Sequence, residues 1–285
     1  MKYLALILAF VFLLGGSPIN PWVGPGLPGD IPETFAGGSS RWSHWDEVTA
    51  ASYQMWLAGW GTLTAFCSMV AYWTDGQKTR LLSAGHCAAA AKLLGMDISV
   101  SQDGANFTAG KMVATGWKVK ADAFCGFMDN PRKRLKDNDD KAWAESLSDC
   151  ANTDAGDWSI WEVQSKLNVV PLGTNRDLKR GDALYIIGYP IGGDAFSSSG
   201  TVSNVKYRAP QTPWDGYIAS DFTALPGSSG SGVFTEDGRI VGILVAGAGD
   251  TFHLTTPIDL VWKEMPCLQA AVVDVAVCVQ PVYHP

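Results

Sequence analysis

The fold is decided by the stretch Pro226-Gly227-Ser228-Ser229-Gly230-Ser231-Gly232, read together with Leu82-Ser83-Ala84-Gly85-His86-Cys87 far upstream. The first stretch sets a serine among glycines, and the second ends an apolar run on a histidine. A serine hydroxyl is a weak nucleophile until a neighbouring base takes its proton, so neither stretch says much alone. Together they suggest a nucleophile and its base.

The glycines of the first stretch favour Ser229 as the nucleophile. Glycine permits tight turns that aim successive N–H groups at one point. Gly227 and Gly230 frame Ser229, and the N–H groups of Gly227 and Ser229 would suit an oxyanion. A flexible Gly/Ser linker is the alternative, but strand-like runs flank the motif at 217–222 and 239–245. The hydrolase elbow G-x-S-x-G is not met, because Ser231 stands where its last glycine belongs.

Composition indicates a folded chain that does not bind nucleic acid. Of the 285 residues, 47% are hydrophobic and 17% charged, which is typical of a chain with a real core. The formal net charge of −7 offers no basic surplus to neutralise phosphates.

Short runs rich in Val, Ile, Thr, Tyr and Trp alternate with turn signals and predict strands. The clearest is a hairpin at 63–73 and 79–82 around the turn Asp75-Gly76. Further strands are expected at 158–163, 183–187, 200–205, 217–220 and 239–245. Many short strands at this spacing favour a sandwich or a barrel. Helical turns are expected at 88–94, and a helix that begins with proline at 257–265.

The N-terminus has the pattern of a secretory signal peptide at 1–17, in which Lys2 precedes an apolar run that is too short to span a bilayer. The alternatives are an uncleaved anchor or a buried helix. Residues 18–40, rich in Pro and Gly, are expected to form a linker or arm. We therefore expect a secreted or periplasmic protein without stable membrane insertion once the signal is removed.

An even number of cysteines behind an export signal predicts disulfides. Six cysteines allow fifteen pairings, and sequence alone does not choose among them. Metal binding is not expected, because the chain has no closely spaced cysteine pair. Sequential pairing is our expectation, so that each bond closes a local loop: Cys67–Cys87, Cys125–Cys150 and Cys267–Cys278.

Five segments in order resemble the trypsin-like serine proteases, and most closely their bacterial branch. The stretch that ends in His86 and Cys87 is similar to the family signature L-T-A-A/G-H-C. Asp157-Trp158-Ser159-Ile160 resembles the strand that carries the family's catalytic aspartate, and 220–234 resembles the segment around its serine. The segments 187–190 and 199–203 resemble two further elements of the bacterial branch.

The resemblance implies a fold and its division. It implies an all-β protein of two packed six-stranded antiparallel β-barrels, chymotrypsin-like, with a short C-terminal helix. We expect an N-terminal barrel at 41–166 with a disulfide-bounded insertion at 125–150, and a C-terminal barrel and helix at 167–265. A disulfide-bounded tail would follow at 266–285. Cys67 and Cys87 resemble the family's disulfide behind the catalytic histidine.

The resemblance also implies the catalytic residues. His86 would be the general base and acid, Asp157 its orienting carboxylate and Ser229 the nucleophile. Asp157 is preferred to its rivals for this reason; the rivals are Asp154, Asp97 and Asp122. The N–H groups of Gly227 and Ser229 would form the oxyanion hole, and no cofactor or metal is needed.

Substrate contacts are also inferred from the resemblance. Thr223 would lie at the base of the pocket for the P1 residue, whose carbonyl is attacked. Leu244, Val245 and Gly247 would form one wall and pair with the substrate backbone. The sequence shows no charged side chain at these positions, and His253 is expected in a late loop. We therefore expect an uncharged P1 residue.

The expected function is a secreted serine endopeptidase that acts on polypeptides through an acyl-enzyme. The alternative is a catalytically silent homologue that serves as a binding module. An esterase using the same residues is a third possibility. The sequence indicates no oligomeric state.

Overall fold

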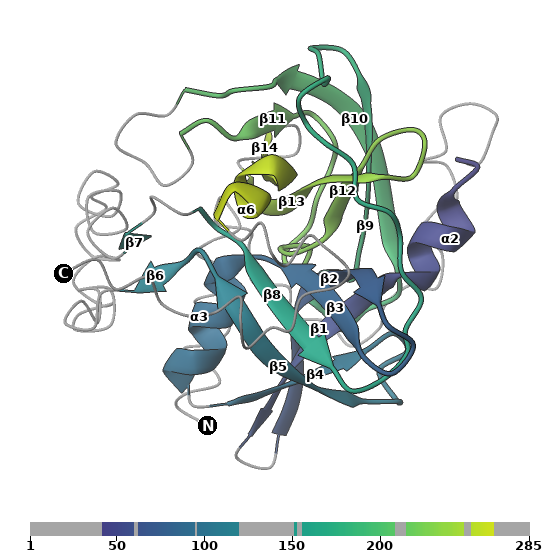
Figure 1. Ribbon diagram of the computed structural model, residues 1–285, viewed down its shortest axis with the longest axis vertical. Coiled ribbons are helices and arrows are strands. Elements are labelled where there is room, and N and C mark those ends of the chain that lie inside the picture. The colour runs from purple at the N-terminus through teal and green to yellow at the C-terminus, as the bar shows by residue number, and fades with distance from the viewer. Residues whose placement is uncertain are drawn as a thin grey trace, which may run out of the picture.

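The computed structural model describes residues 42–59, 62–94, 96–119, 151–152, 156–208, 215–247 and 252–264. Its main strands form two closed, six-stranded antiparallel barrels, as expected. Figure 1 shows the first barrel in purple to teal below the second barrel in green to yellow. Closing each sheet removes the unpaired edges that an open sheet would expose.

The first barrel has the strand order β1-β2-β3-β8-β5-β4. Its strands are β1 (Ser52–Gly59), β2 (Thr62–Thr74), β3 (Thr79–Ser83), β4 (Asp97–Ser101), β5 (Thr108–Thr115) and β8 (Ser159–Val163). The second barrel has the order β10-β11-β14-β13-β12-β9. Its strands are β9 (Ala183–Gly188), β10 (Phe196–Asn204), β11 (Ile218–Ser220), β12 (Gly232–Phe234), β13 (Ile240–Gly247) and β14 (His253–Pro257).

The predicted hairpin is present as β2 and β3, and local chemistry explains its turn. Asp75 Oδ1 accepts from the N–H groups of Gln77 and Lys78, each at 2.8 Å. Gly76 has φ of 90°, a left-handed conformation that favours glycine. All five residues of β3 are buried, so the strand that leads to His86 is fixed by the core.

Among the described residues, three helices accompany the barrels: α2 (Trp45–Ala50), α3 (Gly85–Leu94) and α6 (Ile258–Glu264). The helix α3 begins earlier than the expected 88–94, so its first turn contains His86. The predicted C-terminal helix is α6, which is drawn in yellow next to β13 and β14 in Figure 1. Its Trp262 packs against Tyr72 of β2, with ring centroids 5.5 Å apart. One hydrophobic cluster contains residues of both barrels, so they share a core.

The remaining elements are short. The strands β6 (Lys118–Val119) and β7 (Ala151–Asn152) pair with each other, and a 3₁₀ turn, η2, spans Pro190–Gly192. None of the helices in the described ranges is long and apolar enough to cross a membrane.

One expectation was wrong: His253 lies not in a loop but at the start of β14, paired with Gly247 and Ser220. The predicted signal peptide, the arm at 18–40, the insertion at 125–150 and the tail at 266–285 lie outside the described residues. So do Cys125, Cys150, Cys267 and Cys278. The domain boundaries stay predictions.

Candidate active site

Strand register brings His86 and Asp157 together. The antiparallel strands β3 and β8 pair so that Ser83 lies opposite Ser159. His86 follows Ser83 closely, and Asp157 closely precedes Ser159, so both residues emerge at the same end of the strand pair. The hydroxyl of Ser159 donates to the carbonyl of Ala84 at 2.9 Å and ties the two segments together.

Gly85 permits this close approach. A Cβ atom at Gly85 would lie 2.6 Å from the Cβ of Trp117 and 2.9 Å from the backbone N and O of Trp158. Real Cβ atoms do not approach backbone so closely, because such separations lie inside the van der Waals contact distance. Glycine before His86 therefore allows the first turn of α3 to pack directly on the residue that follows Asp157.

Asp157 holds His86 through both carboxylate oxygens. Oδ2 lies 2.9 Å from His86 Nδ1, and Oδ1 accepts from the His86 backbone N–H at 2.9 Å. The Asp157 residue is 1% exposed. An ionised carboxylate only accepts hydrogen bonds, so Nδ1 carries the hydrogen and Nε2 is left as the basic nitrogen.

The three serines of the glycine-rich loop differ in exposure. Ser228 and Ser231 are 1% and 0% exposed, whereas Ser229 is only partly buried. The neighbouring Gly227 and Gly230 have φ of 93° and 91°, so both glycines adopt the left-handed conformation that the tight loop needs. Among these three serines, Ser229 is the one that a substrate reaches most easily.

The backbone donors of this loop fall into two groups. The N–H groups of Ser228, Gly230 and Ser231 donate to backbone carbonyls at 2.8–3.0 Å. Among the residues that the structure describes, the N–H groups of Gly227 and Ser229 donate to none. Two open donors beside a reachable hydroxyl are the arrangement that an oxyanion needs.

Ser68 of β2 fastens this loop to the first barrel, a role that the sequence did not reveal. Its N–H donates to Ser229 O at 2.8 Å, and its hydroxyl donates to Gly227 O at 2.9 Å. The same hydroxyl accepts from the Tyr189 N–H at 2.9 Å. No local pattern marks Ser68, since its partners lie far along the chain. Its position next to Cys67 is the only hint.

The structure thus places His86 and Asp157 in direct contact, with Ser229 on a loop of the second barrel that is bonded to the first. In the described part of the chain, no hydrogen bond joins the Ser229 hydroxyl to His86. Such bonds often tighten only when substrate is present, so this geometry is compatible with a nucleophile and its base.

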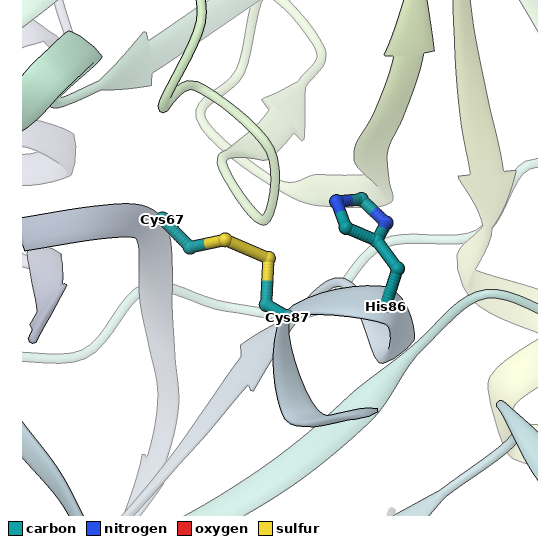
Figure 2. Close-up of side chains that lie close together, drawn as sticks. All are labelled: Cys67, His86 and Cys87. Carbon is teal, nitrogen blue, oxygen red and sulfur yellow. A yellow bond between two sulfur atoms is a disulfide. The ribbon is translucent and has the colours of Figure 1, made fainter. Parts of the chain in front are cut away.

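A disulfide joins Cys67 and Cys87, the one predicted pair whose cysteines both lie in the described residues. Figure 2 shows it beside His86, with Cys87 and His86 both on α3. Ligand atoms of these three residues lie within 4.8 Å of one another, a spacing that would suit a metal if the thiols were free. The sulfur atoms are bonded to each other and provide no thiolate ligands. The bond instead ties α3 to β2.

The residues expected to contact substrate have different surroundings. Thr223 is exposed, and its N–H donates to Ser198 Oγ at 2.9 Å. Leu244 and Val245 are buried, and Leu244 packs in the core cluster of the second barrel. A Cβ atom at Gly247 would lie 2.4 Å from His253 Cδ2, so the buried imidazole lies directly against this glycine. Sequence reasoning missed His253 at this wall.

Comparison with known proteins supports the fold and the family. The family model described as trypsin-like peptidase domain matches residues 70–243. A probable periplasmic serine endoprotease, DegP-like, from Pseudomonas fulva is 30% identical over 59% of this chain and 32% of its own length. A protein of the same description from Halomonas elongata is 35% identical over 27% of this chain and 16% of its own length. The chain therefore spans only a third or less of these relatives.

Solved structures show the same fold. The crystal structure of Deg5 superposes with a TM-score of 0.54 at 20% identity and covers 79% of this chain and 92% of its own. The HtrA-type protease AlgW with a tripeptide superposes with a TM-score of 0.54 at 16% identity, over 79% and 62% of the two chains. Because the family model runs from β2 to β13 and covers more than half of the chain, this protein belongs to the family of trypsin-like peptidase domains.

Proposed function

We propose that the protein is a serine endopeptidase in which His86, Asp157 and Ser229 form the catalytic triad. The observation that carries the proposal is the pair of 2.9 Å contacts between the buried Asp157 carboxylate and His86. A carboxylate that accepts hydrogen bonds from both the backbone and the ring of a histidine fixes the tautomer and the orientation of that ring.

In the proposed reaction His86 Nε2 takes the proton of the Ser229 hydroxyl as Oγ attacks the scissile carbonyl. His86 then gives that proton to the leaving amine, and the acyl-enzyme is hydrolysed by water that His86 activates in the same way. Asp157 stabilises the imidazolium without taking the proton. The open N–H groups of Gly227 and Ser229 would bind the oxyanion.

For the substrate, we propose a polypeptide that lies along the end of β13 as an added strand. Val245 and Gly247 would supply the backbone partners, and Leu244 and Thr223 would shape the P1 pocket. The P1 residue is proposed to be uncharged, because the side chains at these positions carry no charge. The buried ring of His253 narrows the space at Gly247.

For location, we propose export through the N-terminal segment at 1–17. The relatives described as periplasmic support this proposal, as does the apolar run that follows Lys2. The paired cysteines Cys67 and Cys87 also favour an oxidising compartment.

The test uses a fluorophosphonate probe, which labels activated serines, and casein cleavage. The wild-type protein should be labelled and should cleave casein, and Ser229→Ala should lose both. Ser231→Ala, at a buried serine of the same loop, is the matched control and should keep both. Labelling that survives Ser229→Ala would overturn the assignment of the nucleophile. Ester cleavage without peptide cleavage would overturn the endopeptidase assignment.

A further inference from the structure

The main chain of Asp157 is held by two hydroxyl groups of the second barrel. Its N–H donates to the phenol oxygen of Tyr217 at 2.6 Å, and its carbonyl accepts from Thr256 Oγ1 at 2.8 Å. Tyr217 directly precedes β11 and Thr256 lies in β14, whereas Asp157 leads into β8 of the first barrel. These two bonds therefore cross from one barrel to the other.

Tyr217 and Thr256 hold complementary groups of the Asp157 main chain. The Tyr217 oxygen accepts from the Asp157 N–H, and the Thr256 hydroxyl donates to the Asp157 carbonyl. Both polar groups of the Asp157 main chain therefore have a partner in the second barrel.

Burial makes these two hydrogen bonds costly to break. Asp157 and Tyr217 are each 1% exposed, and Thr256 is fully buried. Burial and the nearby charge of Asp157 both raise the pKa of Tyr217, so its hydroxyl stays protonated. A buried donor or acceptor that loses its partner loses more than the bond itself, because water does not replace that partner.

We propose that Tyr217 and Thr256 are positioning residues that set the place of Asp157, and through it of His86, relative to the nucleophile. Both side-chain oxygens of Asp157 contact His86, and the bonds to Tyr217 and Thr256 are made by its main chain. The hydrogen bonds to Tyr217 and Thr256 fix that main chain to the barrel that also carries Ser229. The proposal rests on the triad proposed above.

The packing around Gly156 also holds Asp157 in place. Gly156 has φ of 86°, and a Cβ atom there would lie 2.8 Å from Leu260 Cδ2 and 3.3 Å from the Tyr217 hydroxyl oxygen. The chain before Asp157 thus lies directly against α6 and Tyr217, both of which belong to the second half of the molecule. A shift of Asp157 is therefore opposed on both sides.

The first experiment removes one hydroxyl at a time. Tyr217→Phe and Thr256→Val keep the side-chain shape, and Thr256→Ser keeps the hydroxyl. Well below the unfolding midpoint, we expect Tyr217→Phe and Thr256→Val to lower kcat and the rate of fluorophosphonate labelling about 10- to 100-fold, with KM unchanged. Thr256→Ser should stay within a few-fold of wild type. Wild-type kcat in Tyr217→Phe would overturn the proposal.

Tyr53→Phe is the matched control for a merely structural role. The Tyr53 hydroxyl donates to the carbonyl of Ala50 at 3.1 Å, and the side chain is buried in the first barrel away from Asp157. Loss of the Tyr53 hydroxyl should lower the midpoint of thermal unfolding, while the rate of fluorophosphonate labelling is unchanged. If Tyr53→Phe and Tyr217→Phe slowed labelling equally, the effect of Tyr217 would be one of general stability.

A double-mutant cycle then tests whether Tyr217 acts through Asp157. In an Asp157→Asn background, Tyr217→Phe should slow labelling by less than a factor of two, because the carboxylate that it positions is already gone. The full 10- to 100-fold loss in that background would overturn the proposal. Failure of the triad itself would be seen separately, as labelling that does not depend on Ser229.

Discussion

Ser68 in the first barrel donates its N–H to the carbonyl of Ser229 in the second at 2.8 Å, so the proposed nucleophile is bonded directly to the barrel that carries its proposed base. The hydroxyl of the same residue holds Gly227 O at 2.9 Å. This loop is therefore positioned by both barrels at once.

Replacing Ser68 with Ala should lower kcat by more than its loss of stability accounts for. The change leaves Gly227 O and the Tyr189 N–H without their shared partner, at a cost of about 1–3 kcal/mol. We expect kcat to fall about tenfold, since Gly227 supplies one oxyanion donor. Ser52→Ala is the control, because the Ser52 hydroxyl is buried and donates to Val48 O away from the loop. Equal kcat losses in the two variants would contradict this prediction.

Replacing Gly85 with Ala should separate His86 from Asp157. The new Cβ atom would displace Trp158, which follows Asp157, and fluorophosphonate labelling should slow about 100-fold below the unfolding midpoint. Gly181→Ala provides the comparison: Gly181 has φ of 92° and open space around it, so Ala costs about 1–2 kcal/mol in strain alone. That variant should be less stable and label normally. Normal labelling of Gly85→Ala would show that the contact tolerates displacement.

Replacing Gly247 with Ala should impair substrate binding rather than chemistry. The Cβ atom would meet the His253 ring at 2.4 Å, so either the ring or the end of β13 must move. We expect KM for a peptide with an uncharged P1 residue to rise about tenfold, equal to about 1.4 kcal/mol of binding, while labelling by a small probe changes little. In the double variant Gly247→Ala/His253→Ala, the KM should return part of the way to the wild-type value. An unchanged KM in Gly247→Ala would argue against substrate pairing here.

Removing the disulfide should loosen the His86 turn. Cys67→Ala with Cys87→Ala deletes a bond that closes a loop of sequence separation 20, and removal of such bonds costs about 2–5 kcal/mol. Chemical denaturation should show this loss of unfolding free energy. Below the midpoint the variant should still be labelled, because the Asp157 contacts remain. Unchanged stability would mean that the bond contributes nothing to the fold.

Acid should destabilise the turn between β4 and β5 through Asp103. Its carboxylate accepts from the N–H groups of Ala105 and Asn106, and these bonds hold its pKa below the ordinary value of 3.8. A lowered folded-state pKa contributes stability that is present above pH 3.8 and is lost as pH falls through the folded value. Asp103→Asn should therefore lower the unfolding midpoint at pH 6, and the difference from wild type should shrink toward pH 2. If the difference in unfolding midpoint were the same at pH 6 and pH 2, Asp103 would not be the source of this acid sensitivity.

The sequence predicted those parts of the fold whose signals are local. The β2–β3 hairpin was found because Asp75-Gly76 is a turn signal between two apolar runs, and α6 because a proline begins a helical pattern. No strand was predicted at β1, β4, β5, β12 or β14. His253 was misplaced with β14, because this strand has only five residues and several of them are polar. The strand pattern favoured a sandwich or a barrel, but the division into two six-stranded barrels was expected only through resemblance, since barrel closure depends on pairings between distant strands.

The candidate site divides in the same way. His86 and Ser229 stand in recognisable motifs, and Asp157 could be chosen by resemblance. Ser68, Tyr217 and Thr256 could not be found, because their hydroxyl groups bind backbone atoms 60 to 159 positions away in sequence. A hydroxyl bonded to a remote carbonyl leaves no pattern in its own neighbourhood.

The placement of the proposed triad on two barrels has a consequence for the order of events during biosynthesis. Translation releases the first barrel before the second, and domains commonly fold in that order. A half-made chain would hold a histidine and an aspartate with nothing to activate, and the serine would still be unsynthesised. Proteolytic competence would then arise only as the last strands and α6 close over the first barrel. Completion of the fold would itself serve as the activation step, and a stalled or truncated chain would be harmless to its neighbours.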